Sequence, residues 1–359
     1  MPIIVKNPPQ RVQLEEYECE INKYLERAKG VEGVRGVMSM GSIGAPGLSD
    51  IDLICVVDDD MVAGSAANLG VEGLRKDLFL HGPVIVPESM ISQLQYIIYA
   101  SNLISIMGDD YVDSIVTPEE DLELLKLMYL IDFTESRYGQ YAQVKKRGYI
   151  DQRAWMTRLW SITHTAGLAD DLGIDLSDQS MEILSDVRKL RSDWLEGDEI
   201  EDDWFVKVFI NSEKVLSDVF KTACELAFVK LGGSQLPDKC KIIVGIKRIC
   251  CQKEESSIRG EWGRVPRISQ YITTYANSRY ALYLRKYGFD ILDDSYDDKV
   301  SPMSLLMKKR ASMVRHLYRF HRDKNITFSM GGYLGLPLSK QRKIDSLKFR
   351  LGWIIGNIT

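Results

Sequence analysis

Apolar positions recur with two different periods along the first third of this chain. Over residues 14–28 they return every three or four residues, which predicts an amphipathic helix ending near Gly30. Two short apolar runs follow, at 37–40 and 51–57, and their length and flanking turns predict buried strands. The same patterns predict a helix over 63–77, a strand over 79–86, a helix over 88–103 and a strand over 103–107. This order is typical of a compact unit built on a mixed sheet.

Beyond Pro118 the period changes to that of long helices. We expect four of them, over 119–146, 152–170, 178–195 and 203–230. A third segment begins after the Gly-Gly-Ser stretch at 232–234. The fold class expected is therefore α/β (α+β), with a mixed sheet first and mainly helical domains after it. The expected domains are 1–115, 116–235 and a basic, mainly helical 236–359.

Charge is distributed unevenly along the chain. The net charge of the 359 residues is −5, yet residues 299–359 hold thirteen Lys or Arg and only two Asp, so the rest of the chain sums to −16. Basic residues interleaved with aromatic ones can follow a phosphate backbone and stack on bases, so 299–359 is a candidate contact for a polyanion. Three other interpretations stay open: a solvated helix that packs through its Leu and Met face, a basic surface that docks on the acidic remainder, or cations that hold the phosphates of a nucleotide.

Several classes of protein do not fit this composition. The N-terminal residues lack a charged head followed by a long apolar stretch, and no run of about 18 apolar residues occurs anywhere. The six cysteines are scattered without C-x-x-C spacing, which favours free thiols over disulfides or zinc ligands. We therefore expect a cytoplasmic protein with no membrane partner.

The strongest chemical signal is a pair of aspartates in the second apolar run. Asp50 and Asp52 are two residues apart, and side chains alternate across a strand, so both point to one face. Two carboxylates at that distance repel each other unless a cation or a proton is shared between them. Hard divalent cations prefer such oxygen ligands. The pair is therefore a predicted metal site.

A Gly-Ser turn precedes the aspartates. Gly41 lets the backbone approach an anion, and exposed N–H groups with the Ser42 hydroxyl offer donors. A short Gly/Pro loop then leads through Ser49 to the aspartates. This combination resembles the DNA polymerase β-like nucleotidyltransferase superfamily over roughly the first third of the chain. The resemblance implies a nucleotide-binding site of Gly41, Ser42 and Ser49, in which Gly41 and Ser42 hold the triphosphate and Ser49 supports the loop. It also implies that Asp50 and Asp52 are catalytic ligands of Mg²⁺ (or Mn²⁺), with ATP the expected triphosphate.

One feature departs from that family pattern. Active members commonly supply a third carboxylate from a neighbouring strand, and the matching position here falls near Val84. The closest acids are Asp77 and Glu88. Three interpretations follow: Glu88 or His81 takes the place of the third acid, one metal suffices with a base from elsewhere, or the domain binds nucleotide without transferring it. Glu88 is our candidate for the third catalytic residue.

The resemblance implies transfer of a nucleoside monophosphate from a triphosphate to an acceptor hydroxyl. It allows a small molecule, an RNA end or a protein side chain as acceptor, and the sequence does not choose among them. The alternative function is that of a lapsed nucleotidyltransferase-fold protein, which binds nucleotide or a partner without transfer.

Overall fold

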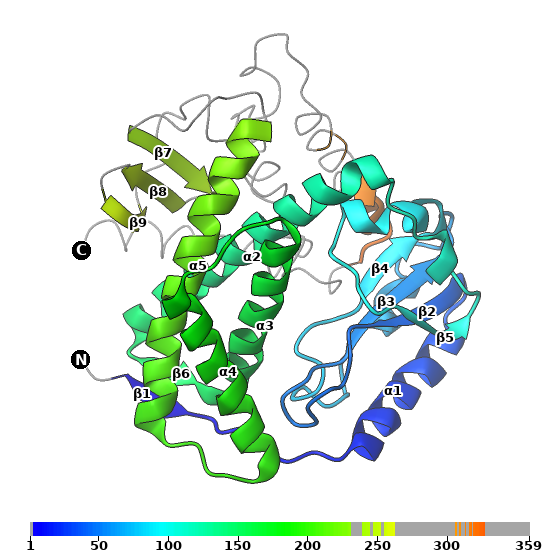
Figure 1. Ribbon diagram of the computed structural model, residues 1–359. Coiled ribbons are helices and arrows are strands. Elements are labelled where there is room, and N and C mark those ends of the chain that lie inside the picture. The colour runs from blue at the N-terminus through cyan, green and yellow to red at the C-terminus, as the bar shows by residue number, and fades with distance from the viewer. Residues whose placement is uncertain are drawn as a thin grey trace.

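The computed structural model describes residues 3–230, three strands between 239 and 262, and, nearer the C-terminus, residues 306, 309, 313, 316, 317 and 319–326. A four-stranded sheet and a group of long helices are its two main parts (Figure 1). The expected α/β content, with helices and a mixed sheet, is confirmed. No helix in the described part of the chain is both long and apolar enough to cross a membrane.

The four-stranded sheet has the order β4-β3-β2-β5. Its strands are β2 (Val34–Met40), β3 (Asp52–Val57), β4 (Val84–Pro87) and β5 (Ile104–Gly108). Strand β2 runs antiparallel to both of its neighbours, whereas β3 and β4 are parallel. Because β3 and β4 are parallel, the residues that precede them lie at the same end of the sheet.

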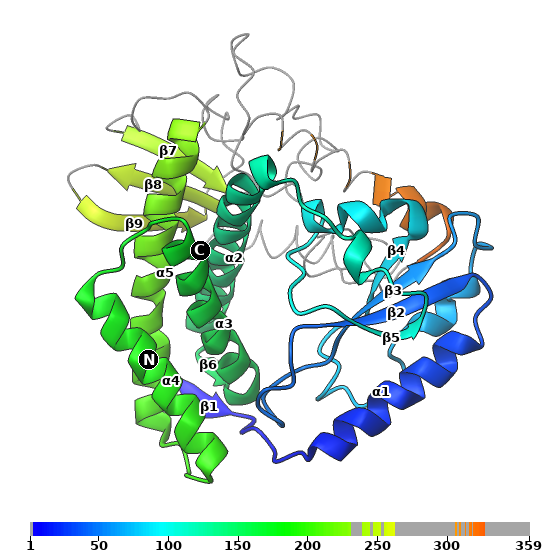
Figure 2. The same ribbon diagram turned by 45° about the vertical axis from the view of Figure 1, so that its right-hand side comes forward.

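Each face of this sheet is covered by a different element (Figure 2). Helix α1 (Leu14–Lys29) packs on the face that includes Leu53, and the 3-10 helix η2 (Glu88–Tyr96) packs on the face that includes Ile54. Alternation along β3 then places Asp52 on the η2 face, next to the apolar cluster that η2 completes. The sequence predicted α1 to within a residue or two of its observed bounds.

Two expected helices of this part are wrong in type and length. The stretch 63–77 contains only a short 3-10 helix, η1 (Ser65–Leu69), because Gly64 and Gly73 have φ of +89° and +82°, outside the helical region. The expected helix over 88–103 is the 3-10 helix η2, which ends at Tyr96. The strand expected over 79–86 shortens to β4, whose first residue follows the Gly82-Pro83 pair.

Long helices make up the second part, and the sequence predicted the bounds of all four to within one residue. They are α2 (Glu119–Arg147), α3 (Gln152–Asp171), α4 (Asp178–Glu196) and α5 (Asp202–Lys230). Helix α3 begins where the Asp151 carboxylate accepts a hydrogen bond of 2.8 Å from the Ala154 N–H. An aromatic cluster fills the centre of the group, with the rings of Tyr141, Trp155 and Phe209 4.6 to 4.7 Å apart.

The N-terminal residues belong to the helical part rather than to the sheet. Strand β1 (Ile4–Lys6) pairs in parallel with β6 (Tyr149–Asp151), between α2 and α3. The Asn7 side chain also donates a hydrogen bond of 2.8 Å to Asp151. Residues 4–7 therefore pack with the helices, and the chain crosses to the sheet at about residue 10. The expected domain 1–115 assigned these first residues to the sheet instead.

The expected third domain, 236–359, is mostly outside the described residues, and its described start is not helical. Strands β7 (Lys239–Val244), β8 (Lys247–Gln252) and β9 (Glu255–Trp262) form an antiparallel sheet. The described residues between 306 and 323 are helical and pack on the first part of the chain: Leu317 and Ile326 are buried in the two cores of the mixed sheet. The C-terminal region is therefore joined to the sheet by a hydrophobic contact.

Candidate functional site

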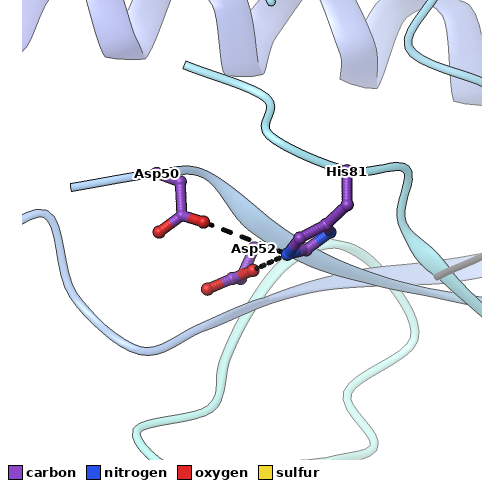
Figure 3. Close-up of side chains that lie close together, drawn as sticks. All are labelled: Asp50, Asp52 and His81. Carbon is purple, nitrogen blue, oxygen red and sulfur yellow. Dashed lines mark ion pairs between the residues drawn. The ribbon is translucent and has the colours of Figure 1, made fainter. Parts of the chain in front are cut away.

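Three side chains that carry opposite charges meet at one end of β3 (Figure 3). The His81 Nε2 atom lies 2.7 Å from Asp52 Oδ1 and 4.0 Å from Asp50 Oδ2. One ligand atom from each of the three residues lies within 4.8 Å of the other two. We call Asp50, Asp52 and His81 the acid–histidine trio. Each of these side chains is between 22% and 25% exposed, so solutes can reach the trio.

The parallel pairing of β3 and β4 explains how the trio forms. Ile54 is paired with Val84, so the residues just before β4 lie beside the start of β3. His81 is three residues before β4 and points at Asp52, while Val84, where the sequence predicted the missing acid, is buried in the core under η2. His81, one of the two substitutes that the sequence suggested, is the residue that the structure brings to the aspartates.

The surroundings of the trio raise the proton affinities of both Asp50 and His81. Burial and the neighbouring charge of Asp52 raise the pKa of Asp50 to about 6. Burial works against the charged imidazole of His81, but its hydrogen bond to Asp52 and the charge of that carboxylate raise its pKa to about 9. At neutral pH and without a metal, an imidazolium therefore partly neutralises two carboxylates.

The Gly-Ser turn lies at the same end of the sheet as the trio. Met40 is paired with Asp52 across β2 and β3, so Gly41 follows directly on the strand beside Asp52. Gly41 has φ of +79°, and open space surrounds the position that a side chain would occupy. Among the described residues, no acceptor takes a hydrogen bond from the backbone N–H groups of residues 42–44. Free N–H groups beside a turn of this kind can cradle an anion.

Ser49, which we expected to support the loop of the nucleotide site, is buried in the loop that precedes the aspartates. It is 8% exposed, and its hydroxyl accepts a hydrogen bond of 3.1 Å from the Ala45 N–H. Its carbonyl accepts bonds from the Tyr17 hydroxyl at 2.7 Å and from Arg153 at 3.1 Å. Ser49 therefore holds the loop in shape, and the structure leaves Gly41 and Ser42 as the exposed members of the expected nucleotide site.

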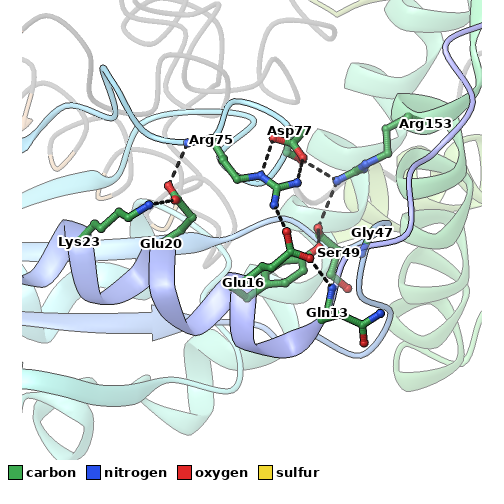
Figure 4. Close-up of polar contacts among 10 residues, drawn as sticks. Gln13, Glu16, Glu20, Lys23, Gly47, Ser49, Arg75, Asp77 and Arg153 are labelled. Carbon is green, nitrogen blue, oxygen red and sulfur yellow. Dashed lines mark hydrogen bonds and ion pairs between the residues drawn. The ribbon is translucent and has the colours of Figure 1, made fainter.

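Side chains from α1 and α3 hold this loop from both sides (Figure 4). Arg153 is buried and also donates a bond of 3.0 Å to the Asp77 carbonyl, just before His81 in the chain. The Thr157 hydroxyl donates to the Leu48 carbonyl at 2.7 Å. Tyr17 accepts from the Gly47 N–H at 2.9 Å. These contacts tie the Asp50 loop and the His81 segment to one rigid frame, and no pattern in the sequence marked Arg153 for this role.

The other two acids near the expected third position lie outside the trio. Asp77 forms an ion pair of 2.5 Å with Arg75, which also contacts Glu16 of α1 (Figure 4). Glu88 follows β4, so it is at the opposite end of the sheet from His81, roughly 15 to 20 Å away at about 3.3 Å per strand residue. Its carboxylate accepts a hydrogen bond of 2.9 Å from the Tyr111 hydroxyl. The structure therefore does not bring Glu88, our candidate third catalytic residue, to the aspartates.

Arginine side chains of the helices contribute positive charge near the trio. The charges of Arg153 and Arg158, both on α3, interact with that of Asp50. Burial and the nearby charge of Arg137, on α2, lower the pKa of Arg158 to about 10. Arg137 itself donates a hydrogen bond of 3.0 Å to Ser161, one turn further along α3. These arginines create a positive environment that suits an anion next to the aspartates.

The trio is a candidate site for a divalent metal ion. Ligand atoms bound to one ion at about 2.1 Å lie roughly 3 to 4 Å apart, which small side-chain rotations of the trio would reach. Its donors are two carboxylates and one imidazole, all of which bind metals in proteins.

The chain was also compared with protein-family models, curated proteins and solved structures, and none of them matches it.

Proposed function

We propose that this chain is a metal-dependent nucleotidyltransferase that moves a nucleoside monophosphate from a triphosphate, with ATP expected, to an acceptor hydroxyl. The observation that carries the proposal is the acid–histidine trio standing beside a Gly-Ser turn with free backbone N–H groups. A cation site next to an anion cradle is what a metal–triphosphate complex requires. The resemblance of the 41–52 motif to polymerase β-like nucleotidyltransferases supports the same conclusion.

Each part of the site has a role in this proposal. Asp50, Asp52 and His81 would hold Mg²⁺ or Mn²⁺, and the ion would neutralise charge on the triphosphate during transfer. The N–H groups of residues 42–44 and the Ser42 hydroxyl would bind phosphate oxygens. Ser49, Tyr17 and Arg153 keep the aspartates in position by holding the loop before them.

The proposed reaction forms one bond and breaks one. The acceptor oxygen bonds to the α-phosphorus while the bond from that phosphorus to its bridging oxygen breaks, and pyrophosphate leaves. The acceptor's proton passes to water or to a base outside the trio. Glu88 is too far away to serve as that base, given its place beyond β4.

The helices behind the trio would receive the acceptor. Arg137 and Arg158 favour an anionic group in this region, either the phosphates of the nucleotide or a phosphate on the acceptor. The proposal leaves open whether the acceptor is a small molecule, an RNA end or a protein. The expected polyanion contact through 299–359 stays a prediction, because most of that segment lies outside the described residues.

One observation favours the second candidate function, nucleotide binding without transfer. Among the described residues, no third carboxylate joins Asp50 and Asp52. A domain of this kind would bind a metal–triphosphate complex and release no pyrophosphate. The two candidates therefore differ in one measurable product.

Transfer of an α-labelled triphosphate tests the proposal. The protein is incubated with Mg²⁺ or Mn²⁺ and each of the four labelled triphosphates, and total RNA, a cell extract or the protein alone serves as acceptor. We expect label to enter one fraction with the wild type and to be lost with Asp50→Asn/Asp52→Asn. Asp60→Asn is the matched control, because Asp60 is exposed near the other end of β3.

The outcomes separate the two functions. Label in an acceptor, absent with the double variant and present with the control, supports transfer and names the acceptor class. Triphosphate binding that the double variant abolishes, without any transfer, supports the alternative. Binding and transfer that are equal in all three proteins would overturn both.

A further inference from the structure

The donor set of the trio differs from an all-oxygen magnesium site in one atom. Asp50 and Asp52 offer carboxylate oxygens, and His81 offers the Nε2 nitrogen, 2.7 Å from Asp52 and 4.0 Å from Asp50. A nitrogen ligand stands here in place of a third oxygen ligand because the parallel register of β3 and β4 brings His81 beside the start of β3. The nitrogen is therefore a built-in part of the site.

The orientation of the imidazole suits a metal ligand. The Nδ1 atom of His81 is 3.0 Å from the Gly82 carbonyl, so Nδ1 carries a proton that it donates to that oxygen. The neutral ring then keeps its lone pair on Nε2, the atom that faces both aspartates (Figure 3). A metal-binding histidine usually has its second nitrogen held in this way by a carbonyl or carboxylate.

We propose that His81 makes this site select a first-row transition ion, with Mn²⁺ as the representative, over Mg²⁺. Mg²⁺ prefers oxygen ligands in a strict octahedron and gives up its water reluctantly, whereas imidazole nitrogen binds transition ions well. The inference rests on the proposed function, because it concerns the ion that would accompany the triphosphate. It adds that His81, rather than a third carboxylate, sets the identity of that ion.

Two direct binding measurements test this inference without any use of activity. Mn²⁺ is titrated into the metal-free protein and free Mn²⁺ is followed by electron paramagnetic resonance; Mg²⁺ is then used to displace it. The two dissociation constants give a ratio of Mg²⁺ to Mn²⁺ for the wild type and for His81→Asp, which replaces the nitrogen by a third carboxylate. We expect the ratio to fall by about tenfold or more in the variant, the scale on which partners of a metal site alter affinity.

Histidine resonances provide the second readout. The chain has four histidines, so their ring signals can be assigned with single His→Gln variants. We expect substoichiometric Mn²⁺ to broaden the His81 signals before those of the other three histidines. His81→Gln, which introduces an uncharged side chain of similar length without the imidazole nitrogen, is the second variant if His81→Asp does not fold. It should lose most of the Mn²⁺ affinity and little of the Mg²⁺ affinity.

Each result has a definite meaning. An unchanged ratio in folded His81→Asp or His81→Gln, or Mn²⁺ binding that leaves the His81 signals sharp, would overturn the inference. If the ratio changes as expected but no label transfer occurs, the inference stands and the proposed function fails. If transfer occurs with equal ratios in all variants, the function stands and the inference fails.

Discussion

Acidic residues stand at both ends of strand β3, and the pair Asp50 and Asp52 has different partners from the pair Asp58 and Asp59. At the far end, Asp58 pairs with Arg35 at 2.5 Å, and Asp59 accepts a hydrogen bond of 3.1 Å from the Ser89 N–H. At the near end, Asp50 and Asp52 share a single imidazole, and the pKa of Asp50 is raised to about 6. Groups of the protein itself compensate the charges of the far pair, whereas the two negative charges of the near pair are only partly compensated by one imidazolium. This difference, more than the presence of acids, makes the near end of the sheet the candidate cation site.

The loops at the two ends differ in how closely other atoms pack against their glycines, and this difference should give the largest effect of substitution. A Cβ at Gly47 would collide with the Gln10 carbonyl oxygen and stand 2.8 Å from the Trp194 ring, at φ of +88°. At Gly33, beside Asp58, the φ is +87° but the nearest atom is 3.4 Å away. We expect Gly47→Ala to lower the free energy of unfolding by about 2 to 5 kcal/mol, the sum of strain and overpacking.

Gly33→Ala is the control for backbone strain alone, because both glycines have nearly the same φ. It should lose about 1 to 2 kcal/mol. Urea denaturation followed by circular dichroism measures both values. Equal losses for the two variants would contradict the tight packing of the loop before the aspartates.

The second prediction concerns pH at the near end. The pKa of His81 is about 9 in the folded protein, above its ordinary value of 6.5, so its partnership with Asp52 stabilises the fold fully below pH 6.5. That stabilisation is lost as pH rises through 9. In EDTA, the wild type should exceed His81→Gln by about 1 to 3 kcal/mol at pH 6, after allowance for partial exposure, and by little at pH 10.

Denaturation curves of the two proteins between pH 6 and 10 check this difference. The gap between the two proteins cancels the titration of groups outside the trio, and it includes the change at Asp50, whose pKa the charge of His81 lowers. If the difference in free energy of unfolding between the two proteins widens with pH, His81 is neutral in the metal-free site. It then does not neutralise the two carboxylates as an imidazolium.

The third prediction is that neutralising Asp50 and neutralising Asp58 change the free energy of unfolding in opposite directions. In metal-free buffer at pH 7.5, Asp50→Asn should raise the free energy of unfolding by about 1 kcal/mol, because it removes one of two repelling buried charges. Asp58→Asn should lower it by about 0.5 to 1 kcal/mol, because it leaves Arg35 without its ion pair. Thermal unfolding of both variants in EDTA measures the two shifts. A loss of stability in Asp50→Asn would place the near pair in the same class as the far pair.

The smallest effect is expected at Glu88. Its carboxylate bonds to Tyr111 at the far end of the sheet, so Glu88→Gln should leave the rate of label transfer and the affinity for Mn²⁺ within about twofold of the wild type. Steady-state transfer assays and Mn²⁺ titration provide the check. A loss comparable to that of Asp52→Asn would restore Glu88 as the third catalytic acid.

Sequence patterns predicted the long helices and the aspartate pair because both depend on local order. The bounds of α2 to α5 follow from apolar spacing, and Asp50 and Asp52 share a face because side chains alternate along an extended segment. The third member of the site depends instead on the parallel register of β3 with β4, which no local pattern specifies. His81 could be suggested from the sequence but not chosen over Glu88.

The role of the loop before the aspartates was also beyond local patterns. Ser49 could be expected to support the loop, yet its bonds to Tyr17 and Arg153 arise between segments 32 and 104 residues apart, so the sequence did not show which residues hold it. The helices expected over 63–77 and 88–103 failed for a simpler reason. Apolar spacing there was compatible with a helix, whereas the positive φ of Gly64 and Gly73 favoured turns.

An anomalous difference map tests the central claim, that the acid–histidine trio holds the metal of a metal–triphosphate complex. Crystals would be grown with Mn²⁺ and a non-transferable ATP analogue and measured near the manganese edge. We expect a manganese peak about 2.1 to 2.3 Å from the carboxylates of Asp50 and Asp52 and from His81 Nε2. Phosphate oxygens should accept hydrogen bonds from the N–H groups of residues 42–44. A manganese peak at Asp58 and Asp59, or a triphosphate bound away from the Gly-Ser turn, would contradict it.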